Sequence, residues 1–137
     1  MSTRQIRMKS ELQVIQSALL PLNINYATPQ HAENDFRDKN IKLYGLVKNN
    51  KIVAICSVVP DTTFNYLAIK RLVVLNPEDR GKGYAKELLN TVVKRQKSAC
   101  GCTPWENNIK MKNLLTALGF IYQYTFNDFW TFWLKEK

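Results

Sequence analysis

The feature that most constrains this chain is a strand-to-helix connection within LVVLNPEDRGKGYAKELL, residues 72–89. An apolar run is followed by Gly81 and Gly83, and apolar residues then recur at helical spacing. Glycine lets a ligand approach the backbone closely, and the first N–H groups of a helix lack internal partners and carry partial positive charge. The connection therefore indicates an anion site suited to a pyrophosphate, to which Arg80 and Lys82 add full charges. A tight turn whose glycines serve only packing is the alternative.

Two common nucleotide-binding motifs do not fit this connection. A P-loop needs Gly, four residues and then Gly-Lys-Ser/Thr, and that spacing is absent. A dinucleotide fingerprint needs Gly or Ala three residues after Gly83, where this chain has Lys86.

Secondary-structure signals predict eleven elements in the order β-α-α-β-β-β-α-β-α-β-β, within one domain spanning residues 1–137. This order predicts an α/β fold with a mixed sheet of about seven strands and helices on its faces. Strands are expected in 3–8, on either side of an Asn49-Asn50 hairpin turn within 41–60, and in 64–75, 98–103, 120–126 and 129–135.

The helix boundaries follow from local signals. The first helix is expected to begin at Ser10, in a capping box with Gln13, and to end at Pro21. Thr28 reads as the N-cap of a second helix with Pro29 in its first position. Residues 83–97 and 108–118 are the other two predicted helices, the last closed by a glycine at position 119. The apolar positions expected to face the core are Leu12, Ile15, Leu19 and Leu20 in the first helix and Ala85, Leu88, Leu89, Val92 and Val93 in the third.

Composition narrows the partners. The chain has 20 Lys and Arg residues against 11 acids, a formal charge of +9, which favours an anionic partner such as a phosphorylated cofactor, an acidic substrate or a nucleic acid. Three cysteines and one histidine do not form a zinc site of the usual spacing, so no metal is expected. No apolar run approaches the length of a membrane span, and a reducing, cytoplasmic setting is the simplest interpretation.

Two segments carry a family resemblance. Arg80-Gly81-Lys82-Gly83-Tyr84-Ala85 resembles the Arg/Gln-x-x-Gly-x-Gly/Ala signature of the GCN5-related N-acetyltransferase (GNAT) superfamily. The segment NNIKMKNLLTALGF, residues 107–120, resembles that superfamily's second motif, an Asn followed twelve residues later by the Phe of Leu-Gly-Phe. The resemblance covers residues 40–134 well and the first 40 loosely, and it implies a mostly antiparallel sheet with helices on both faces.

The resemblance implies an acetyl-CoA site. The strand before the turn is splayed from its neighbour in that superfamily, and free amides there hold the pantetheine arm, here those of Val73 and Leu75 with Val74 between them. Asn108 falls where the superfamily's Asn contacts the same arm. The pyrophosphate would lie on the amides of Gly81, Lys82, Gly83, Tyr84 and Ala85, with Arg80 beside it.

Two departures concern the catalytic side chains. Leu115 occupies the position of the superfamily's general-acid Tyr, so Tyr122, Tyr124 or a water is expected to act instead, unless the thiolate leaves unaided. Lys70 and Arg71 stand where many members carry a Glu general base. The remaining candidate bases are His31, Glu33, Asp35, Glu106 and Asp128, each more simply interpreted as a structural histidine or a solvated acid. Glu106 is preferred because it follows the fifth strand, and its neighbour Trp105 is assigned to the core.

The predicted activity is acetyl-CoA-dependent N-acetyl transfer to a primary amine, with the amide of Val73 or Leu75 stabilising the oxyanion. Basic residues around the strand and third helix favour an anionic acceptor, such as a phosphorylated or carboxylated amine, an acidic peptide or an aminoacyl-tRNA. Alternatively, this basic face is solvated or serves only the phosphates of CoA. The alternative is a non-catalytic module on the same fold that binds CoA or nucleic acid. The C-terminal aromatic residues are expected to be buried in the core or in a homodimer interface.

Overall fold

A seven-stranded sheet in the order β1-β2-β3-β4-β5-β7-β6 forms the centre of the computed structural model, which describes residues 2–63 and 65–137. The elements follow the predicted order. They are β1 (Ser2–Gln5), α1 (Lys9–Leu19), η1 (Leu20–Leu22), α2 (Pro29–Arg37), β2 (Lys42–Lys48), β3 (Lys51–Asp61), β4 (Tyr66–Val74), η2 (Pro77–Asp79), α3 (Tyr84–Arg95), β5 (Cys100–Cys102), α4 (Ile109–Ala117), β6 (Ile121–Phe126) and β7 (Trp130–Lys135). The expected strand 64–75 begins at Phe64, which lies outside the described residues.

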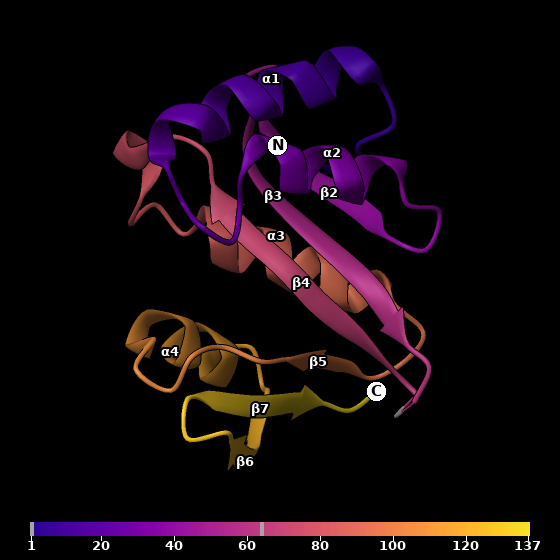
Figure 1. Ribbon diagram of the computed structural model, residues 1–137, viewed down its shortest axis with the longest axis vertical. Helices are drawn as coiled ribbons and strands as arrows, with labels where there is room; N and C mark the ends of the chain where they lie inside the picture. The colour runs from indigo at the N-terminus through magenta and orange to yellow at the C-terminus, as the bar shows by residue number, and fades with distance from the viewer. Residues whose placement is uncertain (1, 64) are drawn as a thin grey trace.

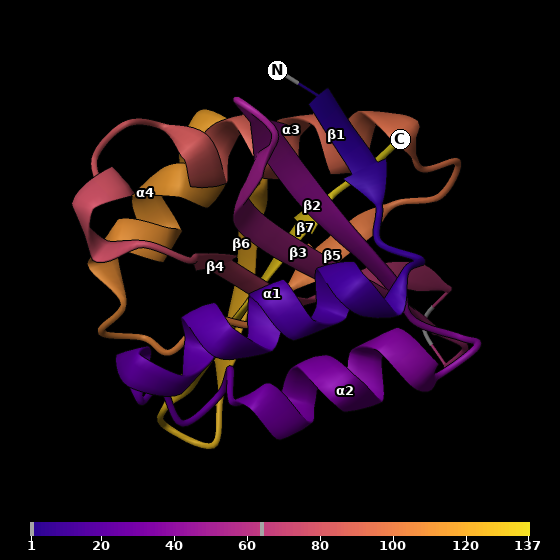
Figure 2. The ribbon, with the colours of Figure 1, turned by 90° about the horizontal axis from the view of Figure 1, so that it is seen from above.

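The sheet is mostly antiparallel, and β4 and β5 form its parallel pair. α1 and α2 lie on one face and α3 and α4 on the other (Figure 2). Each pair of helices closes its own apolar core. One core joins α3 and α4 to the sheet, and the other joins α1 and α2 to β2, β3 and β4. The predicted fold class is therefore confirmed.

The start of α1 differs from the prediction. Met8 is the N-cap in an extended conformation, and its carbonyl accepts the N–H groups of Glu11 and Leu12. Ser10 consequently lies inside the helix, and the expected capping box with Gln13 is wrong. Leu20 falls in the 3-10 turn after α1 and is 70% exposed, so it is not a core residue.

The other local signals are confirmed. Thr28 caps α2 with Pro29 in the first turn. Asn49 and Asn50 adopt positive φ angles of 51° and 62° in the β2–β3 turn, the conformation that a two-residue hairpin requires. A second turn of the same kind, at residues 127–128, joins β6 and β7. Gly119, with φ of 88°, follows the C-cap of α4.

The C-terminal strands bury only part of their aromatic surface. Trp133 is buried against α4 and β5, as expected. Phe129 is 62% exposed, and all six residues of β6 are exposed. β6 is the edge strand of the sheet, so it has a neighbour on only one side.

None of the helices formed by the described residues is long and apolar enough to cross a membrane. Within residues 2–63 and 65–137, no three or more His, Cys, Asp or Glu side chains gather in a way that could hold a metal ion.

Candidate active site

β4 and β5 diverge towards their carboxyl ends (Figure 1). They pair at Leu67 with Cys100 and at Ala68 with Gly101, and β4 then continues to Val74 without β5 beside it. The chain after β5 instead turns to β7, where Trp105 forms an isolated antiparallel bridge with Trp130. We call the space between these two diverging segments the opening. Its backbone edge on the β4 side is the predicted acetyl-CoA arm site.

The register decides which β4 amides face the opening. Leu75 donates its N–H to the Val53 carbonyl on β3, at 2.9 Å, so this amide is not free for a ligand. N–H groups of successive strand residues point to opposite edges, so the N–H of Val73 also faces β3 and that of Val74 faces the opening. The Val73 and Leu75 amides are therefore not free at this edge, contrary to expectation, and the N–H that faces the opening is that of Val74.

A β-bulge in β4 explains why the sequence does not show which of its N–H groups face the opening. Leu67 donates to the Ala99 carbonyl at 2.8 Å, which places odd-numbered amides on the β5 side at the start of β4. The register with β3 then slips at Lys70, between the pairs Ser57–Arg71 and Val58–Ile69. One inserted residue reverses the alternation beyond it.

The connection from β4 to α3 has an open backbone surface. Gly81 and Gly83 have φ angles of +82° and +81°, and a Cβ added to either would meet nothing within 4 Å. Gly83 is the N-cap of α3 and offers no side chain to cap its first turn. The first N–H groups of this twelve-residue helix are therefore available to an anion. This surface fits the diphosphate of a CoA thioester.

The charges around the connection are mixed. Arg80 is exposed, whereas the Lys82 ammonium lies 2.9 Å from the Asp79 carboxylate, whose hydrogen bond raises the pKa of Lys82. Lys48 lies 4.8 Å from the ring centroid of Tyr84 at the start of α3. Lys48 adds a positive charge that sequence analysis missed, because it comes from the β2 end far away in the chain.

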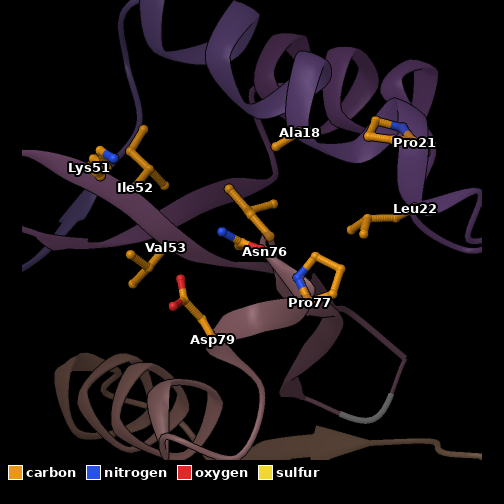
Figure 3. A pocket seen from close by; sticks show the side chains of 10 residues that line it. Ala18, Pro21, Leu22, Lys51, Ile52, Val53, Asn76, Pro77 and Asp79 are labelled. Atoms are coloured by element: carbon orange, nitrogen blue, oxygen red, sulfur yellow. The ribbon is translucent and has the colours of Figure 1, made fainter.

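A cavity of about 390 Å³ lies on the other side of this connection (Figure 3). Its walls come from the end of α1, the η1 turn, the start of β3 and the segment after β4, and they are mostly apolar. Asp79 lines it together with Lys51 and Asn76. No residue of β5 lines this cavity, so it is separate from the opening between β4 and the segment after β5.

Asp35 is buried rather than solvated. Its carboxylate is 1% exposed and contacts two cations of β4: Arg71, with Nε at 2.9 Å and a hydrogen bond from Nη2 at 3.2 Å, and Lys70, with Nζ at 3.5 Å. Ser57 lies opposite Arg71 on β3, and its buried hydroxyl has no hydrogen-bond partner among the described residues. Asp35 thus pairs with both cations that occupy the expected position of the general base, and its single negative charge offsets one of their two positive charges.

Two other candidate bases have structural roles. The Nδ1 atom of His31 accepts the Thr28 N–H at 3.1 Å, while the Thr28 hydroxyl accepts the His31 N–H, which makes His31 the second half of a capping box. Glu33 forms an ion pair with Arg37 one helical turn away, and this partner lowers the pKa of Glu33.

Glu106 and Trp105 lie beside the opening, and both are exposed. The Glu106 N–H donates to the Phe129 carbonyl at 2.8 Å, which fixes this segment against the β6–β7 turn that contains Asp128. Trp105 is 53% exposed and packs edge-to-face on Trp130 at 5.2 Å, so its assignment to the core is wrong.

The structure brings no tyrosine of β6 to the opening, because β7 and β5 separate β6 from β4. The Tyr122 hydroxyl is 2.7 Å from the Thr125 hydroxyl, and its ring packs on Trp133. Tyr124 packs on Phe132 at 5.4 Å. Leu115 is fully buried in the core between α4 and the sheet.

Asn108 is the N-cap of α4, and its side-chain oxygen accepts the Met111 N–H at 3.1 Å. Asn108 is exposed. The cysteines are free and buried, as expected for small core residues, and burial raises the pKa of Cys56, and that of Cys102 to about 12.

Comparison with known families agrees with this geometry. A sequence model of the acetyltransferase (GNAT) family matches residues 9–120, most of the chain. The protein therefore belongs to the GNAT acetyltransferase family, and it is an acyl-CoA-dependent N-acyltransferase. Comparison with the sequences of curated proteins gives no significant match.

Solved structures share the fold at low sequence identity. A spermidine N-acetyltransferase chimera of Vibrio cholerae SpeG and hSSAT is 13% identical, with a TM-score of 0.78 over 99% of this chain and 96% of that one. Arabidopsis thaliana NAA60 in complex with acetyl-CoA is 15% identical, with a TM-score of 0.76 over 98% and 97%. An aminoglycoside 6'-acetyltransferase type Ii is 13% identical, with a TM-score of 0.76 over 99% and 97%.

Proposed function

We propose that this protein transfers the acetyl group of acetyl-CoA directly to the nitrogen of a primary amine. The observation that carries the proposal is the open, side-chain-free start of α3 at Gly81 and Gly83, placed where β4 leaves β5. A helix start of this kind binds phosphate groups through backbone N–H donors. The solved structures of similar fold include enzymes named for acetylation of spermidine and of aminoglycosides, which supports an amine acceptor.

In this proposal each end of acetyl-CoA has its own partners. Its diphosphate lies on the amides of residues 81–85, with Arg80 and Lys82 beside it. Its pantetheine arm enters the opening along β4, where the Val74 N–H is exposed, and the Asn108 amide reaches it from α4. The Val74 N–H also donates to the thioester carbonyl oxygen, and this bond strengthens as the oxygen becomes an oxyanion.

The reaction needs few side chains. The neutral amine attacks the carbonyl carbon, the carbon–sulfur bond breaks, and CoA leaves as its thiolate while the new amide nitrogen loses a proton. Leu115 is buried and cannot donate a proton to that thiolate. Asp35 is held by Arg71, so we assign proton removal to Glu106, acting through water. Positioning of both substrates supplies much of the rate.

Isothermal titration with acetyl-CoA tests the cofactor site. Gly83→Asp places a negative side chain in front of the α3 start and should abolish binding, while the circular dichroism spectrum stays native. Gly83→Ala is the matched control, because it imposes the same strain of a positive φ without the negative charge, and its Cβ would meet nothing within 4 Å. Equal binding by the Gly83→Asp variant would refute the site.

A second function is a CoA-binding module without turnover, favoured by the burial of Leu115 and by the pairing of Asp35 with the β4 cations, which keeps this carboxylate from acting as a base. Release of free thiol with a panel of amines distinguishes the two. In the enzyme, Glu106→Gln should lower kcat by about a hundredfold. Binding of acetyl-CoA without thiol release for any amine would establish the module. The three buried free cysteines suit the reducing cytoplasm that we propose as its location.

A further inference from the structure

The sheet face beside the opening carries a row of aromatic side chains that we call the aromatic wall. It comprises Tyr66, Trp105, Tyr124, Phe126, Trp130 and Phe132. Adjacent rings lie 5.2–6.1 Å apart: Tyr66 on Phe132 at 5.3 Å, Phe132 on Tyr124 at 5.4 Å, Tyr124 on Phe126 at 6.1 Å, and Trp105 on Trp130 at 5.2 Å. The register pairs Phe126 with Trp130, which joins the two groups into one surface.

The wall is continuous from β4 to β6. A Cβ on Gly101 of β5 would stand 2.6 Å from the Tyr66 ring and 3.0 Å from the Phe132 ring, so the two rings close over β5 only because this residue is glycine. Ala68 pairs with Gly101 next to Tyr66. The wall thus begins at the strand that borders the opening.

This face is on the side of α1 and α2, but these helices do not cover it. Their core contains residues from β2, β3 and the end of β4 and none from β5, β6 or β7. In Figure 1 both helices lie at the top with β2 and β3, whereas β5, β7 and β6 lie at the bottom. α3 and α4, whose starts hold the proposed acetyl-CoA contacts, lie on the opposite face. In the proposed function, a thioester that enters between β4 and β5 from that face would present its acyl group to the face that carries the wall.

The charge near the wall is opposite to that of the whole chain. Glu106 and Asp128 are the two charged residues within segments 99–109 and 113–134, which supply most of the wall, and both are acidic, whereas Lys110, Lys112 and Lys135 flank these segments. Glu106 is tied to the β6–β7 turn through its bond to the Phe129 carbonyl, so both carboxylates lie at the opening end of the wall.

The cations that favoured an anionic acceptor are elsewhere or occupied. Arg71 is 10% exposed and paired with Asp35, and Lys70 shares the same carboxylate. Lys94, Arg95 and Lys97 lie just before β5, at the end of that strand where it pairs with β4 rather than diverging from it. Lys112 reaches from α4 to the Glu106 backbone carbonyl at 2.7 Å, so its ammonium is bound there.

From these observations, and resting on the proposed function, we infer that the acceptor is a cationic amine that carries a second positive charge. The second cation lies on the aromatic wall near Glu106 and Asp128 while the amine at the other end reaches the thioester. Aromatic faces attract ammonium groups through their negative π surface, and a carboxylate at the rim adds to this attraction. The anionic acceptor favoured by total charge is thereby replaced.

The test uses the full chain and three acceptors of matched length: cadaverine, pentylamine and 5-aminovalerate. Each has a chain of five carbons with a primary amine at one end, and the far end carries a second ammonium group in cadaverine, is a methyl group in pentylamine and is a carboxylate in 5-aminovalerate. We expect kcat/KM to fall in that order, with cadaverine favoured over pentylamine by about tenfold through KM. Raising the salt concentration should narrow the gap, because the attraction to the carboxylates is screened.

Variants locate the second cation. Asp128→Asn and Trp105→Leu should each lower the cadaverine-to-pentylamine ratio severalfold, and Glu136→Gln, at the far C-terminal end, should leave it unchanged. A ratio of one or less in the wild type, or a preference for 5-aminovalerate, would overturn the inference while acetyl transfer itself stands.

Binding is measured separately from turnover. Tryptophan fluorescence reports on Trp105 and Trp130, so each acceptor is titrated in the presence of CoA. Tighter binding of cadaverine than of 5-aminovalerate supports the inference even in a protein that releases no thiol, and equal or weaker binding refutes it. Failure of acetyl-CoA binding or of thiol release would count against the proposed function instead.

Discussion

The Nε atom of Arg71 lies 2.9 Å from a carboxylate oxygen of Asp35, and the two side chains are only 10% and 1% exposed. The pair joins α2 to β4 beside the opening. It places a buried ion pair where sequence alone suggested an exposed cation and a separate surface acid.

Removing Asp35 should strongly destabilise the protein. Asp35→Ala leaves Arg71 buried without a counter-charge, and we expect the free energy of unfolding to fall by about 3–5 kcal/mol in urea titrations. Glu33→Ala on the same helix is the control, because its pair with Arg37 is exposed and should matter far less. A double variant Asp35→Leu/Arg71→Met should recover most of the loss. Similar stability of the Asp35→Ala and Glu33→Ala proteins would contradict this account.

Asp79 should weaken acetyl-CoA binding by occupying Lys82. Their ammonium–carboxylate contact of 2.9 Å is exposed, so Asp79→Asn frees the cation without disturbing the core. We expect roughly two- to fivefold tighter binding at low salt, an advantage that shrinks at high salt. Lys82→Gln should weaken binding. Isothermal titration calorimetry measures the affinity of both variants for acetyl-CoA, with Glu136→Gln as the control for loss of a surface charge. Unchanged affinity in both variants would show that Lys82 is not part of the site.

The buried thiols should make the fold sensitive to alkaline pH. Burial raises the pKa of Cys102 from 9.0 to about 12, so above pH 9 the unfolded chain loses this proton while the folded protein keeps it. The folded state then binds more protons than the unfolded state, and stability falls as pH rises from about 9 towards 12. Each such thiol contributes about 1.4 kcal/mol per pH unit.

Urea titrations at pH 8 and pH 10 measure this slope. Cys102→Val keeps the volume and removes the thiol, so it should flatten the slope. The same slope in wild type and variant would show that Cys102 is not the source. Cys56, whose pKa is also raised by burial, is the second position to substitute.

His31 should prove replaceable by a capping residue. Gln at this helix position can accept the Thr28 N–H as His31 Nδ1 does, so His31→Gln should retain stability, whereas His31→Ala should lose about 0.5–1 kcal/mol. Acetyl transfer by His31→Gln should stay within about twofold of wild type. A large loss of kcat with native stability would restore His31 as the general base.

Local signals predicted the elements well because each lies within a few residues. Asn49 and Asn50 tolerate positive φ, Thr28 with Pro29 starts a helix, and Gly83 ends the connection at an open helix start. The capping box at Ser10 failed because the N-cap of α1 is Met8, two residues earlier, which lacks a capping side chain. Competing starts so close together differ little in local energy.

The positions of the site residues depended on contacts between residues that are far apart in the chain. The inserted residue at Lys70 reversed which β4 amides face the opening, and an apolar run contains no mark of such a slip. Trp105 was assigned to the core because burial of an aromatic residue depends on which elements cover it. Asp35 met Arg71 across 36 positions of the chain, and their charges say nothing about that distance.

The sequence by itself determined the order of elements, the glycine-dependent helix start and the family, because these rest on backbone preferences and spacing within short segments. Tertiary structure alone decided how charge is distributed: it buried Asp35 with the cations of β4 and gathered the aromatic wall beside the only two charges of its segments, Glu106 and Asp128. The physical reason is that net charge is a sum over all residues of the chain, and the alternation of apolar and polar residues is counted along one segment. The field at a site depends on which few groups the fold places there and which of them it neutralises.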